Sequence, residues 1–132
     1  MRKKLLSILV LLGFFLCSYG QSDSLTFTDS VFTYEVVSSG EVKVTCTDGF
    51  SEATMELPET VTYDDQTYTV VENGDFSGNY YYLKELILPK TLKRIDVALL
   101  TANMNYLVKV KVDSDNPYFT DHEGCLYSKD IR

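Results

Sequence analysis

One stretch of the chain repeats itself after 24 residues. Residues 68–88 align with residues 92–112 without a gap, and some positions carry the same side chain in both copies. The identical pairs are Asn79/Asn103, Tyr82/Tyr106 and Leu83/Leu107. Similar residues pair at Val71/Ile95, Glu72/Asp96, Gly74/Ala98, Phe76/Leu100, Ser77/Thr101, Gly78/Ala102, Leu86/Val110 and Leu88/Val112. Because apolar positions meet apolar positions and small positions meet small ones, we interpret the stretch as two copies of one structural unit.

Each copy also contains the pattern of a short β-strand. Apolar residues alternate along Leu83-x-x-Leu86-x-Leu88 and again along Leu107-x-x-Val110-x-Val112, which is the period of a strand with one buried face. Strands stacked at this period form a parallel sheet, and repeats of this length are typical of stacked units that share one core. The opposite face of the predicted sheet carries Glu85, Ile87, Lys109 and Lys111.

The repeated unit resembles that of the BspA-like leucine-rich repeat proteins of bacterial surfaces, which reads roughly V-x-x-I-G-x-x-A-F-x-x-C-x-x-L-x-x-I-x-[IL]-P. Residues 71–76 and 83–89 follow this outline. Asp75 replaces the usual Ala in the first unit, Leu99-Leu100 replaces Ala-Phe in the second, and Asp113 replaces its final Pro. The resemblance covers roughly residues 32–128. It implies a mainly β fold: a leucine-rich repeat solenoid with an N-terminal β-hairpin cap and about two to three repeats.

Residues 1–20 have the pattern of a signal peptide. The basic residues 2–4 precede an apolar run from Leu5 to Cys17, and Ser18-Tyr-Gly20 follows as a cleavage site. The apolar run is shorter than the roughly 20 residues that span a bilayer. We therefore expect a secreted or cell-surface protein with no membrane insertion after cleavage. Lipid attachment at Cys17 is the alternative, and the large residue Leu16 before it disfavours that reading.

The charge of the chain excludes some classes of partner. Lys and Arg number 12 against 19 Asp and Glu, which gives a net charge of −7. Nucleic acids draw most of their affinity from clustered basic side chains, so we expect no nucleic-acid partner. The same reasoning disfavours anionic membrane surfaces.

Three further segments complete the predicted domain organisation. Residues 21–30 are expected to form a flexible arm, in which Asp23-Ser-Leu25 and Asp29-Ser-Val31 resemble acceptor sites of a bacterial secretory O-glycosylation system. Residues 31–63 are expected to form the N-terminal β cap, since two alternating runs flank Ser38-Ser-Gly40 as in a hairpin. Its inward residues would be Phe32, Tyr34, Val36, Val42, Val44 and Cys46. Residues 64–132 would hold the repeats.

The last repeat starts at Asp113 and does not finish. Solenoids require covered ends, because a bare strand edge tends to pair with another chain. The chain is therefore expected either to be the front of a longer array or to have its open end covered by a partner. We expect self-association through this end.

The cysteines and titratable residues indicate no catalytic or metal site. Cys46 and Cys125 remain after signal cleavage, and both are interpreted as small core residues, although a disulfide is chemically allowed outside the cell. His122 is interpreted as part of an exposed polar turn. Asp113, Asp115 and Asp121 offer a minor candidate for a weak divalent site, but Pro117 and Gly124 break the calcium-loop pattern. We expect no cofactor, no metal and no enzyme activity.

The tyrosine run 80–82 is the most unusual feature of the composition. Tyr82 and Tyr106 are expected to stack in a ladder, and Tyr80 and Tyr81 to be exposed. The leading hypothesis is an adhesin-like module that binds an extracellular protein or glycan. The contacts would come from Tyr80 and Tyr81 and from the sheet face, which carries Glu85, Ile87, Lys109 and Lys111. The alternative is a structural cap or spacer of a longer leucine-rich array that has no ligand of its own.

Overall fold

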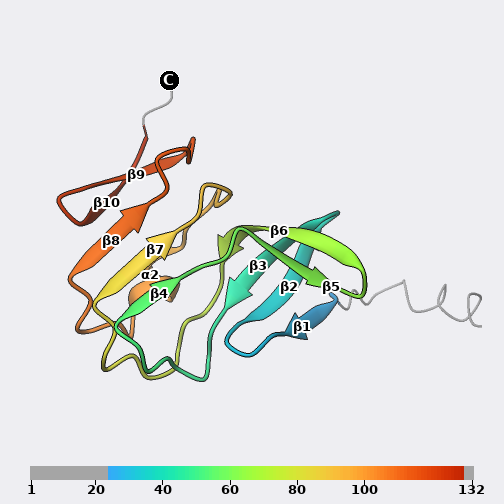
Figure 1. Cartoon of the computed structure of the whole chain (residues 1–132), viewed down its shortest axis with the longest axis horizontal. Helices are drawn as coiled ribbons and strands as arrows, with labels where there is room; N and C mark the ends of the chain where they lie inside the picture. Colours follow the sequence, from blue (N-terminus) through green and yellow to red (C-terminus); the bar gives the residue numbers. More distant parts are fainter. Residues whose placement is uncertain (1–23, 130–132) are drawn as a thin grey trace, which may run out of the picture.

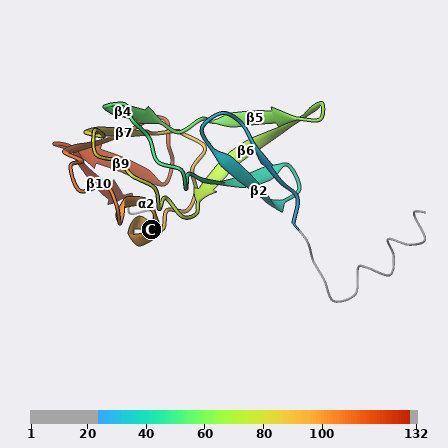
Figure 2. The same cartoon turned by 90° about the horizontal axis from the view of Figure 1, so that it is seen from below.

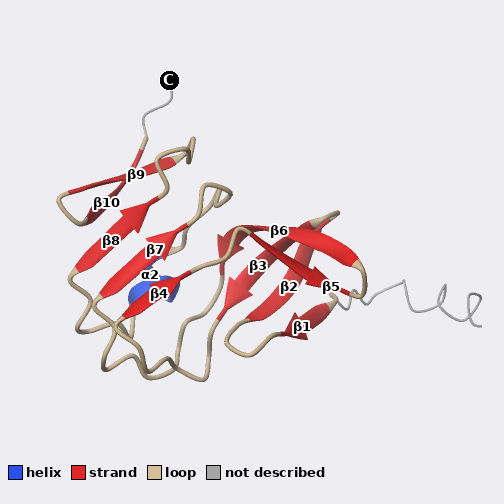
Figure 3. Cartoon of the chain, in the orientation of Figure 1, coloured by secondary structure: helices blue, strands red, loops and turns tan. Residues whose placement is uncertain are grey.

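The computed structural model describes residues 24–129, and this part of the chain is mainly β (Figures 1 and 3). It contains two larger sheets, one further hairpin and one short helix. The signal peptide predicted at 1–20 lies outside the described residues, as does Asp23 of the first glycosylation tripeptide.

The first sheet has five strands in the spatial order β1, β2, β3, β6, β5. These are β1 (Thr26–Thr28), β2 (Thr33–Ser38), β3 (Glu41–Thr45), β6 (Gln66–Asn73) and β5 (Thr60–Tyr63). The predicted hairpin is confirmed, since β2 and β3 pair antiparallel with Tyr34 opposite Val44. Gly40 closes its turn with a positive φ of 74°, a conformation that glycine adopts at little cost. Five of the six predicted inward residues are buried, and Val36 is half-buried.

The arm expected over residues 21–30 is in part a strand. β1 pairs antiparallel with β2, and Phe27 is buried between two exposed threonines. The ring of Phe27 lies 4.4 Å from that of Tyr63 and 5.5 Å from that of Tyr34, centroid to centroid. One aromatic side chain therefore docks a segment whose remaining composition is polar.

The second sheet is parallel and has the predicted repeat register. Its strands are β4 (Thr54–Glu56), β7 (Glu85–Leu88) and β8 (Lys109–Val112). Leu86 lies opposite Val110 and Leu88 opposite Val112, so the offset between β7 and β8 is that of the sequence repeat. Met55, Leu86, Leu88 and Val112 are buried beneath the sheet, and Val110 is half-buried. The predicted register is confirmed.

A second row of backbone contacts runs beside this sheet. β3 pairs parallel with β6, and Glu72 of β6 forms a parallel bridge with Arg94. The backbone N–H groups of Lys93 and Arg94 both donate to the carbonyl of Val71, at 2.8 and 3.2 Å. Three successive segments thus each contribute one piece to both rows: β3 with β4, β6 with β7, and residues 93–95 with β8. The first of them lies in the region that was expected to be only a cap.

One hydrophobic core extends under both sheets, from Phe27 to Val112. Helix α2 (Val97–Thr101) lies on the core side of the parallel sheet, below β4 and β7 in Figure 2. It buries Leu100, the repeat partner of the fully buried Phe76. The carboxylate of Asp96 caps the helix by accepting from the N–H of Leu99 at 3.1 Å.

A hairpin of β9 (Phe119–His122) and β10 (Cys125–Ser128) lies beyond β8 (Figure 1). The N–H of Val110 donates to the carbonyl of Gly124 at 2.9 Å, and the N–H of Val112 donates to Oδ1 of Asp121 at 2.8 Å. These two N–H groups point away from β7. The edge of β8 that was expected to be open is therefore partly covered by the following residues.

Two buried asparagines connect successive segments. Nδ2 of Asn116 donates to the carbonyls of Pro89 and Leu92, and its Oδ1 accepts from the N–H groups of Tyr118 and Phe119. Asn73, the last residue of β6, makes a comparable link by exchanging hydrogen bonds with the backbone of Asp96. Each side chain thus replaces backbone pairing where the strands end.

Candidate binding surface

The four predicted sheet residues lie together on the outer face of the parallel sheet. Glu85 is flanked by Thr54 and Lys109, and Ile87 is flanked by Glu56 and Lys111. Lys109 and Lys111 are exposed, whereas Glu85 and Ile87 are half-buried. Nζ of Lys109 lies 3.8 Å from the carboxylate of Glu85, so part of the charge on this face is paired internally.

Tyr80 does not belong to this surface, contrary to the prediction. It is 1 % exposed, and its hydroxyl donates to the carbonyl of Cys46 at 2.5 Å. Burial, together with this contact, raises the pKa of Tyr80. Met104, its partner in the repeat, is buried as well. That apolar match was the signal in the sequence that Tyr80 occupies a core position.

Three exposed tyrosines lie near this surface: Tyr81, Tyr82 and Tyr106, at 65 %, 64 % and 52 % exposure. The ladder predicted for Tyr82 and Tyr106 is wrong, because among the described residues these two rings make no stacking contact. Tyr81 lies beside Tyr106 instead, with ring centroids 6.5 Å apart and ring planes at 56°. Nζ of Lys84 lies 6.0 Å from the centroid of the Tyr106 ring. These residues come just before β7 and β8, at the amino-terminal end of the parallel sheet.

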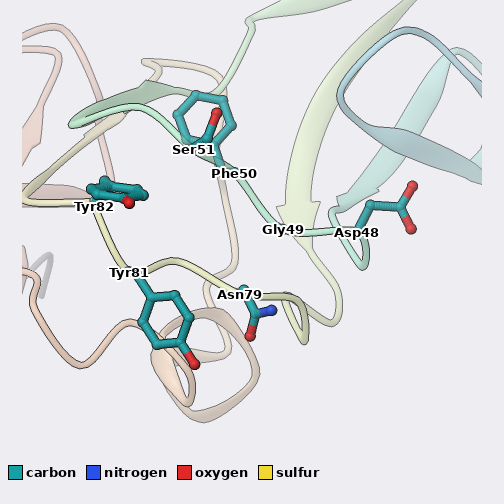
Figure 4. Close-up of a pocket in the computed structure, with 7 residues that line it drawn as sticks. All are labelled: Asp48, Gly49, Phe50, Ser51, Asn79, Tyr81 and Tyr82. Carbon is teal, nitrogen blue, oxygen red and sulfur yellow. The ribbon is translucent and has the colours of Figure 1, made fainter.

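Two hollows open beside Tyr81 and share it as a wall, together with Asn79. The larger encloses about 320 Å³ and is lined by Asp48, Gly49, Phe50, Ser51, Asn79, Tyr81 and Tyr82 (Figure 4). The smaller encloses about 170 Å³ and is lined by Ser77, Gly78, Asn79, Tyr80, Tyr81, Asn103, Asn105 and Tyr106. In Figure 4 the rings of Phe50 and Tyr82 lie on one side, and the side chains of Tyr81 and Asn79 extend to the other.

Two glycines hold the base of these hollows together. A Cβ on Gly78 would lie 2.0 Å from the nitrogen of Gly49, and a Cβ on Gly49 would lie 2.6 Å from the carbonyl oxygen of Asn79. Gly49 also has a φ of 92°, which other residues rarely adopt. Beside them, the N–H of Phe50 donates to the carbonyl of Asn79 at 2.8 Å. The two loops are therefore in backbone contact. A side chain at Gly49 or Gly78 would clash with the backbone of the other loop.

A third hollow of about 340 Å³ lies at the opposite, carboxyl-terminal end of β4 and β7. It is lined by Glu56, Leu57, Pro58, Glu59, Ile87, Leu88, Pro89 and Asp113. No cluster within residues 24–129 has the spacing of a metal site. Of the carboxylates considered earlier, Asp113 accepts from the N–H of Asp115, and Asp121 accepts from that of Val112. Both carboxylates thus have structural partners.

The two cysteines differ in their surroundings. Cys46 is buried as predicted, but Cys125 is exposed, because the inward position of β10 is taken by Leu126. Both thiols are free, so the two residues form no disulfide. His122 lies exposed at the end of β9, with Nε2 3.6 Å from the carboxylate of Glu123.

No protein-family model matches the chain, and no curated protein matches it. A solved structure does: a leucine-rich cell surface protein from Faecalibacterium prausnitzii A2-165, with a TM-score of 0.53 and 19 % sequence identity. The two chains are similar in fold. The match covers 73 % of this chain and 25 % of the other, so this chain spans about a quarter of that protein.

Proposed function

We propose that this chain is a leucine-rich repeat solenoid of the BspA-like type, secreted or displayed at the cell surface, that binds an extracellular protein or glycan. Support for the solenoid comes from the two rows of stacked segments and from the likeness to a leucine-rich cell surface protein. The signal pattern of residues 1–20 supports export. No helix among the described residues is long and apolar enough to cross a membrane. The proposal assigns the chain no catalytic role and no nucleic-acid partner.

The observation that carries the binding function is the group of three exposed tyrosines, Tyr81, Tyr82 and Tyr106. Large aromatic side chains are costly to leave in water, and tyrosine offers a rigid apolar surface with a polar tip. Residues of this kind dominate the energy of many binding surfaces. They also lie beside two hollows, which gives a partner concave surface to fill.

The outer face of the sheet would form the rim of this surface. Lys109 and Lys111 are exposed there and follow directly after the tyrosine loop of their repeat. Exposed charges at a rim contribute mainly to the association rate and to specificity. Glu85 and Ile87 complete the face, as predicted from the sequence.

The second candidate function is that of a structural spacer in a longer array. It is favoured by the pairing of Glu85 with Lys109 across neighbouring strands, which satisfies charges on the face without any ligand. On this reading the tyrosines would be surface residues without a partner, and the chain would only hold its neighbours apart.

A binding panel separates the two functions. We would present extracellular matrix proteins, serum proteins and surface glycans to residues 21–132 and to the double variant Tyr81→Ser/Tyr106→Ser. Tyr80 stays unchanged because it is part of the core. The matched control is Tyr118→Ser/Tyr127→Ser, which removes two exposed tyrosines elsewhere.

Specific binding that falls at least about tenfold, roughly 1.4 kcal/mol, in the first variant and not in the control supports the binding function. Thermal melting of each variant checks that the fold is kept. Binding to no member of the panel, or equal loss in both double variants, supports the spacer.

A further inference from the structure

We propose that the two hollows beside Tyr81 form a groove for a neutral oligosaccharide, with one sugar residue on each side of the Tyr81 ring. This inference rests on the binding function proposed above and names its ligand class. The shared wall is the starting point, since Asn79 and Tyr81 line both hollows and make them neighbouring parts of one site.

The aromatic rings provide surfaces on which a sugar can stack. The face of a tyrosine ring is electron-rich, and it attracts the weakly positive C–H groups along one side of a pyranose ring. Tyr81 and Tyr106 are both more than half exposed and belong to consecutive repeats. Their ring planes are inclined at 56°, so they form two walls of a hollow and do not cover each other.

The polar lining suits hydroxyl groups. Asn79, Asn103 and Asn105 place three exposed carboxamides around the smaller hollow, with Ser77 beside them. A carboxamide both donates and accepts hydrogen bonds, and so does each sugar hydroxyl. These three side chains are exposed and make no hydrogen bond to another side chain or to the backbone within residues 24–129, so their groups are open to a ligand.

The sequence repeat supplies an independent indication. Asn79 and Asn103 are the same residue in both copies, yet both are exposed and contribute nothing to the core. Core packing therefore does not account for their identity. The repeat instead places one carboxamide per unit along the same edge of the fold, at a spacing set by the stacking of the strands.

Charge selects a neutral ligand over an acidic one. The chain has a net charge of −7, and its field disfavours uronic acids and sulfated sugars. Of the described residues that line the two hollows, only Asp48 carries a carboxylate, and in Figure 4 this group points away from Tyr81 and Tyr82. Among residues 24–129, no Lys or Arg lines either hollow, and Nζ of Lys84 lies 6.0 Å from the centroid of the Tyr106 ring.

The base of the groove is already formed before binding. The contact between Gly49 and Gly78 and the hydrogen bond from Phe50 to Asn79 fix the two loops that carry the lining residues. A ligand therefore does not have to order them, and this lowers the entropic cost of binding.

The test is an array of neutral oligosaccharides, comprising gluco-, manno-, galacto-, xylo- and chito-oligosaccharides, with polygalacturonate and heparin as acidic probes. Hits are measured by saturation-transfer NMR and calorimetry on residues 21–132. We expect binding to at least one neutral probe. Tyr81→Ala should weaken it by about tenfold or more, whereas Tyr81→Phe, which keeps the ring, should retain most of it.

Two further variants locate the polar contacts. Asn79→Ala and Asn103→Ala should each weaken binding several-fold, and Tyr127→Ala, an exposed tyrosine on β10, should change nothing. Binding of acidic probes only, or binding that Tyr81→Ala leaves unchanged, overturns the inference. Tyr81-dependent binding of a protein with no sugar bound overturns the sugar groove but not the binding function. No ligand of either class overturns both.

Discussion

Asp29 shows how one side chain can close a turn. Its carboxylate accepts from the N–H groups of Val31 and Phe32 at 2.8 and 2.7 Å, and from the hydroxyl of Tyr34 at 2.8 Å. Burial by itself raises the pKa of Asp29, but these hydrogen bonds to the charged form outweigh it and lower the pKa below the ordinary value. The turn between β1 and β2 therefore favours the ionised carboxylate.

The lowered pKa predicts an acid-sensitive contribution to folding. A carboxylate with a depressed pKa stabilises the fold above its unfolded pKa, near 4, and that contribution is lost as the pH falls through the folded value. Asp29→Asn should reduce the free energy of unfolding at pH 7 by of order 1 kcal/mol, since the site is exposed. The difference from wild type should shrink below about pH 4.

Urea denaturation between about pH 2.5 and 7, a range that extends on both sides of the ordinary pKa near 4, measures this difference. Ser30→Ala in the same turn is the control, because it leaves the carboxylate in place. A constant gap between Asp29→Asn and wild type over the whole range would contradict the assignment.

Single residues also mark the limit of what the sequence revealed. The repeat alignment paired Leu86 with Val110 and Phe76 with Leu100, and all four contribute to the core, Val110 as a half-buried residue. Tyr80 was misplaced because a tyrosine fits both a surface and a core that offers its hydroxyl an acceptor. That acceptor is the carbonyl of Cys46, which lies 34 residues away in the chain. The residues around Tyr80 in the sequence do not indicate this contact.

At the level of elements, the repeat register gives the strongest stability prediction. Leu86→Asp places an unpaired charge in the core and should destabilise the fold by about 4 kcal/mol or more. Val110→Asp introduces the same charge one strand later at a half-buried site, so its effect should be smaller. Lys111→Asp on the outer face is the control and should change stability by about 0.5 kcal/mol at most. Thermal unfolding followed by circular dichroism ranks the three, and a ranking with Lys111→Asp as the most damaging would mean a different register.

A second stability prediction concerns Asn116, whose side chain helps to attach the last hairpin. Asn116→Ala would leave two carbonyls and two N–H groups without their partner in a buried site, and we expect a loss of at least about 2 kcal/mol. Asn105→Ala, at an exposed asparagine, should stay within about 0.5 kcal/mol of wild type. Hydrogen exchange at Tyr118 and Phe119 should rise in the first variant. Unchanged protection there would show that the hairpin is held by other contacts.

Elements whose sequence has a regular apolar period were predictable, and those without such a period were not. β7 and β8 follow from periodicity, and the β2–β3 hairpin follows from alternation around Gly40. β1 was missed because a single buried aromatic in a polar segment carries no period. The tyrosine hollows depend on backbone contact between Gly49 and Gly78, and isolated glycines in a sequence do not reveal what they touch.

For the molecule as a whole, we expect the contact between β8 and the β9–β10 hairpin to limit self-association. Self-association through this end stays a prediction, and the structure identifies the groups that oppose it: the carbonyl of Gly124 and the carboxylate of Asp121. Asp121→Ala removes the partner of one edge N–H and should therefore increase self-association. Asp115→Ala, at an exposed position in the preceding turn, is the control.

Static light scattering at matched concentrations measures the average mass of each form. A higher mass for Asp121→Ala than for Asp115→Ala and wild type is expected. Equal masses across the concentration series would mean that this edge takes no part in assembly.

The attachment of the hairpin also sets the order in which the molecule yields to mechanical force. Tension applied through Lys129 would load the antiparallel pairing of β9 and β10 from its open end, where Ser128 lies opposite Phe119, so that the bonds break one after another. The hairpin is joined to β8 through few bonds, whereas β8 is paired with β7 along its whole length. Under this tension the hairpin would peel away first, while the stacked strands and the tyrosine groove beside them would remain intact.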